Sequence, residues 1–329
     1  MKIGLGVAQI GGAQFISAIK CQLQSAGFEI VWLLNKKPEG EWLKHVDPVA
    51  DRFHVLNSDE REDRLSQLNL SCLIVNIFSN FETRLILEAR ELGIPSIGFL
   101  DFWTRLMDRI KYRDKLVFPD RLLVLDEPTR DFYAKLGMNT DYISLSTNPH
   151  WNKTTKRAQR PLGEKILVPF QDSTPAANVD FGEWLTSLAR ISAKVNEGNE
   201  LKIEIKWHPT FRVPINLERI SDQLGISVVH ELNVWEEYFC TVGLYSSILF
   251  EAALREIPAC SFCENEAFFL NFSVPHIDKF TNAQDLAHFL KTNFQDRTLK
   301  KGKVISSKIA QRCPIVQTIQ DLLRQTNTI

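Results

Sequence analysis

LKIEIKWHP, at residues 201–209, and GLYSSILFEAA, at residues 243–253, decide the fold of this chain. The first segment alternates polar and apolar side chains, as a strand does, and its final proline stops the strand. The second opens with two serines and continues as an apolar helix, whose first backbone N–H groups lack partners within the helix. Residues that follow a parallel strand lie at the carboxyl edge of the sheet, where ligands bind. The two segments therefore predict a parallel sheet with a ligand site at this edge.

The same alternation of strands and helices runs through the whole chain. We expect strands at residues 2–8, 28–34, 71–78, 95–101, 121–126, 165–170, 202–207, 227–230 and 257–262, with helices between them. The pattern lapses over residues 141–163, which marks a linker. It is typical of the α/β class and predicts a GT-B-like arrangement of two Rossmann-like, doubly wound domains that face a central cleft. The domains span residues 1–150 and 151–329, and the last helix, near residues 315–325, is expected to pack back on the first domain.

The composition narrows the class of function. Lysine and arginine total 39 residues against 40 aspartates and glutamates, and this balance argues against a nucleic-acid-binding protein. Six cysteines among apolar neighbours fit a reducing compartment, and nothing completes the spacing of Cys260 and Cys263 into a zinc or redox site. No signal peptide or membrane-spanning segment is expected, so we predict a cytoplasmic protein. The basic amphipathic stretch 105–115 is expected to be a solvated helix face or a peripheral contact with the inner face of the membrane.

A phosphate site is predicted in the second half of the chain. His208 ends a strand, where an imidazole can donate to a phosphate oxygen or carry the proton that a leaving phosphate needs. Ser246 and Ser247 open a helix whose N-terminus favours anions. Glu251, one turn further, can accept a hydrogen bond from a ribose hydroxyl. Each residue also has a structural interpretation, as a strand-ending or helix-capping group. The predicted nucleotide-binding residues are Lys206, His208, Pro209, Tyr245, Ser246, Ser247 and Glu251.

The two motifs resemble those of a known group of enzymes. A His-Pro element after a strand and a Ser-Ser element that opens a helix are similar to the motifs of bacterial sialyltransferases and Kdo transferases of the GT-B architecture. The resemblance covers residues 164–265 in detail. It implies that His208 and the two serines bind the phosphate of a cytidine nucleotide and assist its departure. Teichoic-acid glycerophosphotransferases carry a similar Lys-x-His-Pro and serine element, so the resemblance leaves the transferred group open.

A glycosyl transfer also needs a carboxylate, as a base or a nucleophile. Asp101 and Asp126 both end strands of the first domain. Asp101 is preferred, because an aromatic pair that includes Trp103 can form a wall for a sugar ring, and Arg105 or Arg109 can meet an acidic sugar. Capping of the following helix is an equal alternative for Asp101. The related enzymes are implied to carry an acidic-acidic-glycine triplet here, which this chain lacks, so the catalytic carboxylate is left open.

Glycines and polar residues follow two further strands of the first domain. Gly11 and Gly12, with Gln14, allow close approach to the backbone and are predicted to face the acceptor, with a simple tight turn as the alternative. Their spacing fits neither a dinucleotide fingerprint nor a Walker loop. Asn76 and Glu82 can add polar contacts after the next strand. No Asp-x-Asp element follows an apolar strand, so no metal site is predicted.

These observations lead to one principal hypothesis and two alternatives. The principal one is a metal-independent glycosyltransferase that requires no cofactor and uses a nucleotide-activated sugar, a CMP-linked sialic acid or Kdo, with a glycan or lipid-linked glycan as acceptor. Its catalytic residues would be His208 with Asp101 or Asp126. The first alternative is a CDP-glycerol glycerophosphotransferase or a sugar-nucleotide epimerase or hydrolase on the same scaffold. The second is a nucleotide-sugar-binding protein without activity. The sequence leaves the oligomeric state open.

Overall fold

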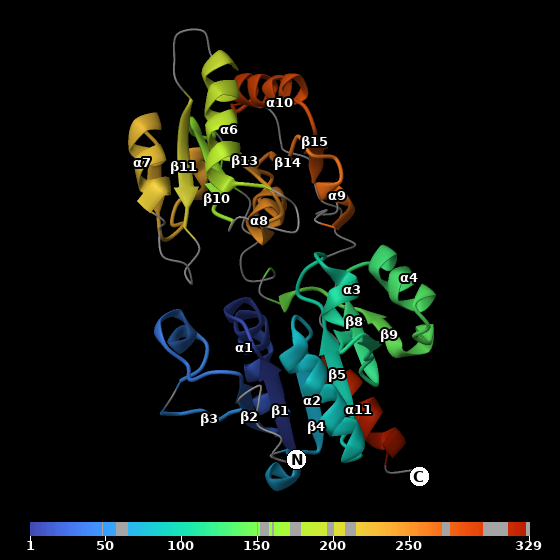
Figure 1. The fold of residues 1–329 in the computed structure, drawn as a ribbon. Coiled ribbons are helices and arrows are strands. Elements are labelled where there is room, and N and C mark those ends of the chain that lie inside the picture. Colours follow the sequence, from blue (N-terminus) through green and yellow to red (C-terminus); the bar gives the residue numbers. More distant parts are fainter. Residues whose placement is uncertain are drawn as a thin grey trace. The chain divides into compact units, whose positions relative to one another are not determined.

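The computed structural model describes residues 1–47, 49–56, 65–149, 151, 158–159, 161–171, 179–195, 201–207, 215–271, 277–298 and 315–326. It divides into two compact units (Figure 1). Unit 1 comprises Met1–Lys153 and Ser307–Ile329, and unit 2 comprises Thr154–Ser306. Each unit is built on one large parallel sheet, and the predicted α/β class is therefore confirmed.

The sheet of unit 1 has seven strands within the described residues. Their order is β3 (Arg52–Val55), β2 (Glu29–Leu34), β1 (Lys2–Val7), β4 (Cys72–Asn76), β5 (Ser96–Phe99), β8 (Arg121–Val124) and β9 (Ile143–Leu145). Every neighbouring pair is parallel. The chain starts in the middle of the sheet, moves to one edge and then returns to build the other half. The order of strands thus reverses between β1 and β4, which is where a doubly wound sheet binds its ligands.

Helices cover both faces of this sheet. On one face, α1 (Ile10–Ser25) packs on β1 and α11 (Ile315–Thr326) packs on α1, and their buried side chains form one hydrophobic cluster. On the other face lie α2 (Asn80–Glu91) and α4 (Glu127–Lys135), whose side chains join a second cluster. Gly6 of β1 allows the close packing of α2, because a Cβ atom there would lie 2.7 Å from Leu85. Short 3-10 helices at Gly40–Lys44, Leu65–Leu68 and Thr140–Tyr142 complete the described elements between the strands.

The basic stretch 105–115 is not the single amphipathic helix that the sequence suggests. It forms the four-residue helix α3 (Leu106–Arg109) and then a hairpin of β6 (Lys111–Tyr112) and β7 (Lys115–Leu116). The hairpin turn places Arg113 and Asp114 at positive φ angles of 47° and 63°. A helix cannot continue through two left-handed residues, which explains the difference.

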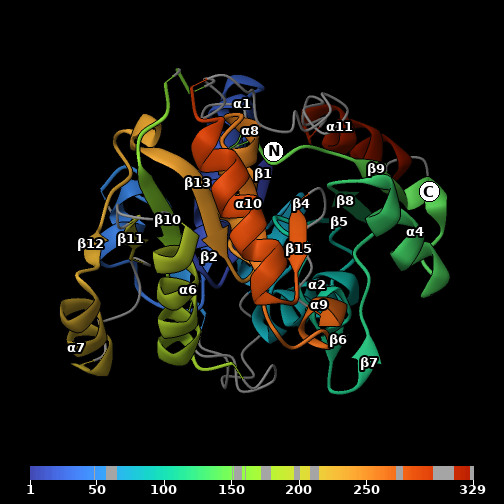
Figure 2. The same cartoon turned by 90° about the horizontal axis from the view of Figure 1, so that it is seen from above.

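Unit 2 repeats the same winding. Its six described strands follow the order β12 (Ser227–Val229), β11 (Lys202–Lys206), β10 (Lys165–Pro169), β13 (Tyr238–Gly243), β14 (Ala259–Phe262) and β15 (Asp278–Phe280), all parallel. The order reverses between β10 and β13. The described helices are α6 (Phe181–Val195), α7 (Ile215–Leu224), α8 (Ser247–Leu254), α9 (Phe268–Asn271) and α10 (Ala283–Gln295), with a 3-10 turn at Trp235–Glu237. Helices α6 and α10 lie side by side over the sheet (Figure 2).

The sequence pattern does not predict β3, β9, β13 and β15. Three of these are strands of three or four residues at the edges of the two sheets, which are too short for a reliable prediction. The fourth, β13, lies in the middle of its sheet and is buried at every position. Such a strand shows no polar-apolar alternation, and Thr241 and Gly243 interrupt the continuous apolar run by which a buried strand such as β4 can still be predicted.

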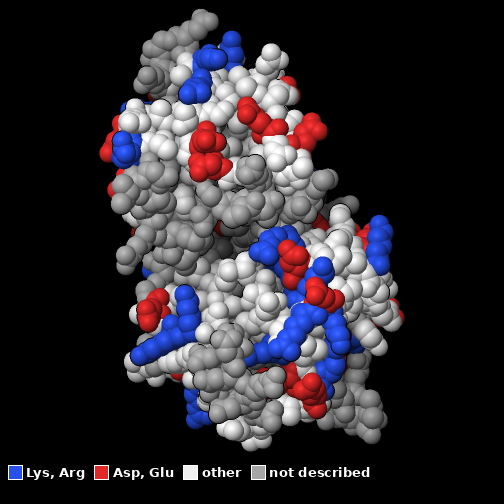
Figure 3. Space-filling model, viewed as in Figure 1, with Lys and Arg blue, Asp and Glu red and all other residues white. Residues whose placement is uncertain are grey.

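The described surface carries charges of both signs. On the face shown in Figure 3, Lys and Arg side chains lie among Asp and Glu side chains, in agreement with the net charge of −1. None of the described helices has the length and apolar character that crossing a lipid bilayer requires. Cys260 and Cys263, which share the spacing noted in the sequence, are buried free thiols.

Candidate functional site

The strand reversal of unit 2 is held together by one glutamine. Gln171 is the second residue after β10 and is 7% exposed. Its side-chain oxygen accepts hydrogen bonds from the backbone N–H groups of Leu244 (2.9 Å) and Tyr245 (2.8 Å), which follow β13. From the other side, the Ser261 hydroxyl of β14 donates to the Leu244 carbonyl. The segment between β13 and α8 is therefore fixed at the carboxyl edge of the sheet by both of its neighbouring strands.

This fixed segment places the N-terminus of α8 at the edge of the sheet. Ser246 is the N-cap of α8, and its side-chain oxygen accepts a hydrogen bond of 3.3 Å from the Ile248 N–H. The capping alternative therefore describes what Ser246 does in this structure. Its hydroxyl proton remains available to a ligand, because capping uses only the oxygen lone pair. The helix N-terminus also carries a partial positive charge that favours phosphate.

Glu251 lies one turn into α8 and interacts with the serine before it. Burial raises the pKa of Glu251 to about 7. Three interactions lower the pKa and so oppose this shift: the positive charge of Arg255, a hydrogen bond from the Ser247 hydroxyl and the positive charge of Lys206. The ammonium group of Lys206, at the end of β11, donates to the Trp207 carbonyl (2.7 Å). Ser247 and Lys206, two of the predicted nucleotide-binding residues, thus both interact with a third, Glu251.

Aromatic side chains accompany this edge of the sheet. Trp207 stacks on Phe170 with ring centres 3.9 Å apart, and both follow their strands directly. Tyr245 is half-buried, with its ring centre 6.0 Å from that of Phe268. His208 and Pro209, the other two residues of the predicted site, lie outside the described residues, so their predicted roles stay predictions.

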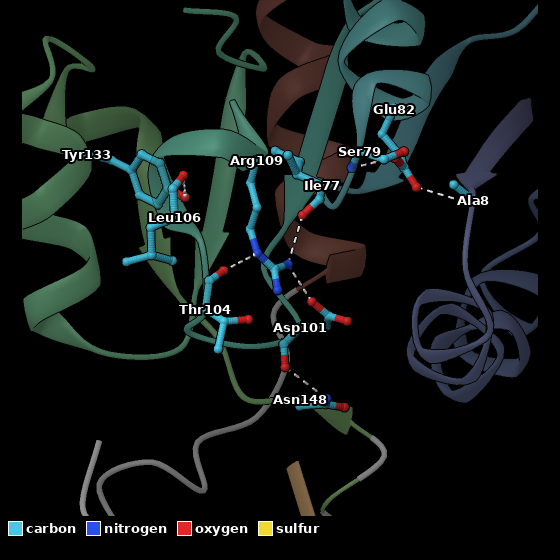
Figure 4. A network of polar contacts seen from close by, with 10 residues as sticks. All are labelled: Ala8, Ile77, Ser79, Glu82, Asp101, Thr104, Leu106, Arg109, Tyr133 and Asn148. Carbon is cyan, nitrogen blue, oxygen red and sulfur yellow. Dashed lines mark hydrogen bonds and ion pairs between the residues drawn. The ribbon is translucent and has the colours of Figure 1, made fainter. Parts of the chain in front are cut away.

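The strand reversal of unit 1 is bridged by a buried glutamate. Glu82 of α2 accepts hydrogen bonds from the Ala8 N–H after β1 (2.7 Å) and from the N–H (2.9 Å) and hydroxyl (2.6 Å) of Ser79 after β4 (Figure 4). Ser79 and Glu82 together form the capping box of α2. Burial raises the pKa of Glu82 to about 7, although these hydrogen bonds oppose the shift. Glu82 is therefore a structural link between the two loops.

Asp101 and Arg109 form a buried ion pair in the same unit. The Arg109 guanidinium donates from Nη1 to Asp101 Oδ1 (2.7 Å) and to the Ile77 carbonyl (2.9 Å), and from Nε to the Thr104 carbonyl (2.7 Å) (Figure 4). Arg109 is 2% exposed, whereas the side chain of Asp101 is 15% exposed. Asp101 does not cap α3, whose N-cap is Arg105. Its carboxylate is thus partly accessible at the carboxyl edge of β5.

Asp126 is used differently from Asp101. One oxygen of Asp126 accepts the Thr129 N–H (2.9 Å) and caps α4, and the other accepts the indole N–H of Trp103 (2.8 Å). Trp103 is buried and stacks on Trp151 with ring centres 5.6 Å apart. The structural role of Asp126 is therefore evident, and Trp103 is part of the core that this aspartate helps to order.

The glycine pair begins α1 beside Asp101 and Asn76. A Cβ atom at Gly11 would lie 3.7 Å from Asp101 Oδ2, and one at Gly12 would lie only 2.7 Å from the Asn76 amide nitrogen. The N-cap residue Gln9 makes no side-chain capping bond. Gln14 follows on the same helix and is half-buried, and Arg105 is exposed and pairs with Asp108. Gly11 thus lies against the candidate carboxylate and Gly12 against Asn76; both are helical residues, and the tight-turn alternative is wrong.

A cavity of about 590 Å³ lies elsewhere in unit 1. Its lining includes Pro95, Asp120 and Asn139, which come before strands β5, β8 and β9, together with Arg90, Arg121 and Leu322. These residues mark the amino edge of the sheet. Ligands of doubly wound sheets bind at the carboxyl edge, so this cavity is not the candidate site. Within the described residues, no cluster of His, Cys, Asp or Glu has the make-up of a metal site.

One residue that organises the site, Gln171, is not among the sequence candidates, and the structural role of a second, Glu82, was not predicted. Gln171 gave no signal, because a glutamine after a strand is common and its bonding partners lie 73 and 74 residues away. Glu82 was visible only as a polar residue after a strand, although the Ser79–Glu82 spacing is that of a capping box.

The chain is similar to known proteins in its fold and not in its sequence. No protein-family model matches the sequence, and no curated protein matches it. The solved structure of UDP-GlcNAc 2-epimerase from Methanocaldococcus jannaschii is similar, with a TM-score of 0.66 and 13% identity over 98% of this chain and 100% of the epimerase. HepE from Anabaena in complex with UDP-glucose has a TM-score of 0.64 and 12% identity over 100% of both chains. MurG from Acinetobacter baumannii has a TM-score of 0.53 and 11% identity over 100% of both chains. The chain has the GT-B-like fold of these proteins, with two Rossmann-like domains.

Proposed function

We propose that this protein is an enzyme that binds a UDP-sugar through unit 2 and acts on the sugar as an epimerase or a hydrolase. The observation that carries the proposal is the fixed N-terminus of α8, held by Gln171 and followed one turn later by Glu251. The helix N-terminus suits a diphosphate, and the Ser246 hydroxyl can donate to one of its oxygens. Glu251 suits a ribose hydroxyl, which donates to its carboxyl group.

The choice of UDP rests on the solved structures of similar fold. The epimerase from M. jannaschii was solved with UDP-GlcNAc and UDP, the Neisseria meningitidis epimerase with UDP-GlcNAc, and HepE with UDP-glucose. These ligands favour a uridine nucleotide over the CMP-linked sialic acid or Kdo of the principal sequence hypothesis. They also favour the sugar-nucleotide epimerase, which the sequence left as an alternative.

The residues of this chain can support the chemistry in two places. In unit 2, the N-terminal N–H groups of α8 stabilise the negative charge of a phosphate that leaves the sugar. In unit 1, Asp101 presents a partly exposed carboxylate, whereas both oxygens of Asp126 are bonded within the protein. We therefore prefer Asp101 over Asp126 as the candidate carboxylate of unit 1, and His208 remains a candidate proton donor to the leaving phosphate.

A glycosyltransferase remains the second candidate. It is favoured by the similarity to MurG over the full length of both chains and by Gly11, which is exposed at the start of α1. In that case a glycan or lipid-linked glycan acceptor would approach unit 1.

Titration calorimetry followed by a product assay tests the proposal. We expect UDP and UDP-GlcNAc to bind and CMP to bind more weakly. Nuclear magnetic resonance of the reaction mixture should then show either a new UDP-sugar epimer or UDP with free sugar. Glu251→Gln should weaken UDP binding about tenfold, while the matched change Glu218→Gln, at an exposed position of α7, should not. If no uridine nucleotide binds the wild-type protein, or if Glu251→Gln binds UDP as the wild type does, the site assignment is wrong.

A further inference from the structure

We propose that the cavity at the amino edge of unit 1 is a second ligand site, which takes an organic anion with a flat apolar body and one phosphate or carboxylate group. All of the residues that line it belong to unit 1. The site would therefore stand even if unit 2 bound no nucleotide.

The cavity has the size and the walls of a small-molecule site. Its volume of about 590 Å³ falls within the range of roughly 300–1,000 Å³ that is usual for ligand pockets. Met138 and Leu322, which are 6% and 5% exposed, extend the two hydrophobic clusters of unit 1 into its wall. The other apolar or aromatic side chains of the lining are Ile94, Pro95, Phe118, Pro119 and Tyr142. The body of a ligand that fills this space must be apolar, because burial against such a wall stabilises only apolar surface.

Two arginines give the cavity its charge. Arg90, near the end of α2, donates from Nη2 to the Phe118 carbonyl (2.5 Å), which ties its side chain to the segment before β8. Within the described residues, Arg90 pairs with no carboxylate, so its other N–H groups are available to an anion. Arg121, the first residue of β8, lies over the Tyr142 ring, 4.3 Å from the ring centre. Both guanidinium groups are thus held at the cavity by a contact with its own lining.

The acidic residue of the lining does not cancel this charge. Asp120 Oδ2 accepts hydrogen bonds from the N–H (2.7 Å) and the hydroxyl (2.8 Å) of Ser96, which is 2% exposed. Two cations therefore face one carboxylate that is already bonded to the protein. Guanidinium groups bind phosphate and carboxylate groups through charge-assisted hydrogen bonds. The cavity should accordingly prefer an anionic group to a neutral one.

Tyr142 and α11 narrow the shape of the ligand and indicate what it would stabilise. Tyr142 is 45% exposed, and its ring, together with the guanidinium that lies over it, offers a surface on which a flat group can stack. Leu322 belongs to α11, which lies beside the amino end of β5 (Figure 1). A bound ligand would contact this helix and so stabilise its packing on unit 1.

The test uses 2-naphthyl phosphate, 2-naphthoate and the uncharged 2-naphthylmethanol as probes of the full-length protein in titration calorimetry. A probe of about 15 non-hydrogen atoms should reach a Kd of roughly 0.5 mM. We expect at least one of the two anions to bind the wild type with this affinity or better, and the alcohol to bind at least about fivefold more weakly. The anion that binds more tightly shows whether the site takes a phosphate or a carboxylate. Excess UDP should leave its Kd unchanged, because a probe at the N-terminus of α8 would compete with UDP.

Variants of the lining test the two parts of the site separately. Arg90→Gln and Arg121→Gln should each weaken the binding of the anion about tenfold. Ile94→Trp, which fills the cavity from a half-buried position, should weaken the binding of all three probes. Arg52→Gln is the matched control, since Arg52 is an arginine of the same unit that pairs with Glu29 and does not line the cavity. It should bind every probe as the wild type does.

Differential scanning calorimetry locates the bound probe. At ten times its Kd, the anion should raise the Tm of the unit 1 transition by roughly 3–6 °C and leave that of unit 2 unchanged. Arg90 is exposed, so Arg90→Gln keeps the test decisive if Arg121→Gln or Ile94→Trp does not fold, as judged by circular dichroism. The inference is overturned if neither anion binds, if the alcohol binds as tightly as the anions, or if the folded arginine variants bind the anion as the wild type does. It is also overturned if UDP displaces the probe or if only the unit 2 transition rises.

Discussion

Replacement of Gln171 by methionine should loosen the nucleotide site of unit 2 without changing its shape. Methionine has nearly the length of glutamine but cannot accept the two backbone N–H groups that Gln171 binds at 2.9 and 2.8 Å. Leu244 is 1% exposed, so its N–H would lose its only described acceptor in a buried place. A buried group without a partner costs about 1–3 kcal/mol, and the half-buried Tyr245 N–H would add about 1 kcal/mol. We therefore expect a loss of about 2–4 kcal/mol in the free energy of unfolding.

Differential scanning calorimetry measures this loss as a fall in Tm of roughly 5–15 °C for the transition that contains unit 2. Titration of Gln171→Met with UDP should show a weaker affinity than that of the wild type. The reason is that Leu244 and Tyr245, which lose their hydrogen bonds to Gln171, directly precede the N-terminus of α8. Gln171→Glu is the matched control, since its carboxylate can still accept both bonds, and it should lose less than half as much stability. Neutral surface substitutions change the free energy of unfolding by up to about 0.5 kcal/mol. If the free energies of unfolding of Gln171→Met and Gln171→Glu both lie within this range of the wild-type value, Gln171 does not hold this segment.

Three further predictions concern unit 1. The pKa of Glu82 rises from 4.5 to about 7 on folding, so between these pH values the folded state keeps a proton that the unfolded state loses. The free energy of unfolding should therefore fall by up to about 3 kcal/mol as the pH rises from 4.5 to above 7. Urea titrations at several pH values should show this fall for the wild type and a smaller one for Glu82→Gln. Gly12→Ala should destabilise the protein by about 1–3 kcal/mol, because its Cβ would lie 2.7 Å from the Asn76 amide, whereas Gly11→Ala should be tolerated; equal stability of the two variants in thermal melts would contradict this packing. Ile319→Ala removes a fully buried side chain of α11 and should cost about 2–5 kcal/mol in the transition of unit 1, with that of unit 2 unchanged in calorimetry.

The sequence was sufficient for the fold class because the strongest signals are local. Continuous apolar runs such as residues 71–78, followed by amphipathic helices, predict parallel strands at or near the observed positions. The exact winding was not predictable, because it depends on β13, whose apolar run is interrupted by Thr241 and Gly243. The hairpin after α3 was missed because its turn places Arg113 and Asp114 at positive φ angles, where a glycine would have been the usual sequence signal.

Some residues of the candidate site could also be predicted from the sequence, and others could not. The serine pair and Glu251 could be found because a helix start is a local feature of the sequence. The roles of Asp101 and Asp126 could not be separated, since both are aspartates that end strands. What distinguishes them is the identity of their partners, Arg109 in one case and Trp103 in the other, which lie 8 and 23 residues away. Long-range hydrogen bonds of this kind have no signature in a single sequence.

Helix α11 imposes an order on the synthesis of this protein. It supplies Ile315, Ile319 and Leu322 to the core that β1 and α1 begin, although residues 154–306 of unit 2 lie between them in the chain. A ribosome that adds about 5–20 residues per second needs roughly 10–35 s to extend the chain from residue 153 to residue 326. During this time unit 2 can fold, while the apolar face of α1 is not yet covered by α11. The nascent chain should therefore present this face to chaperones until α11 has been synthesised.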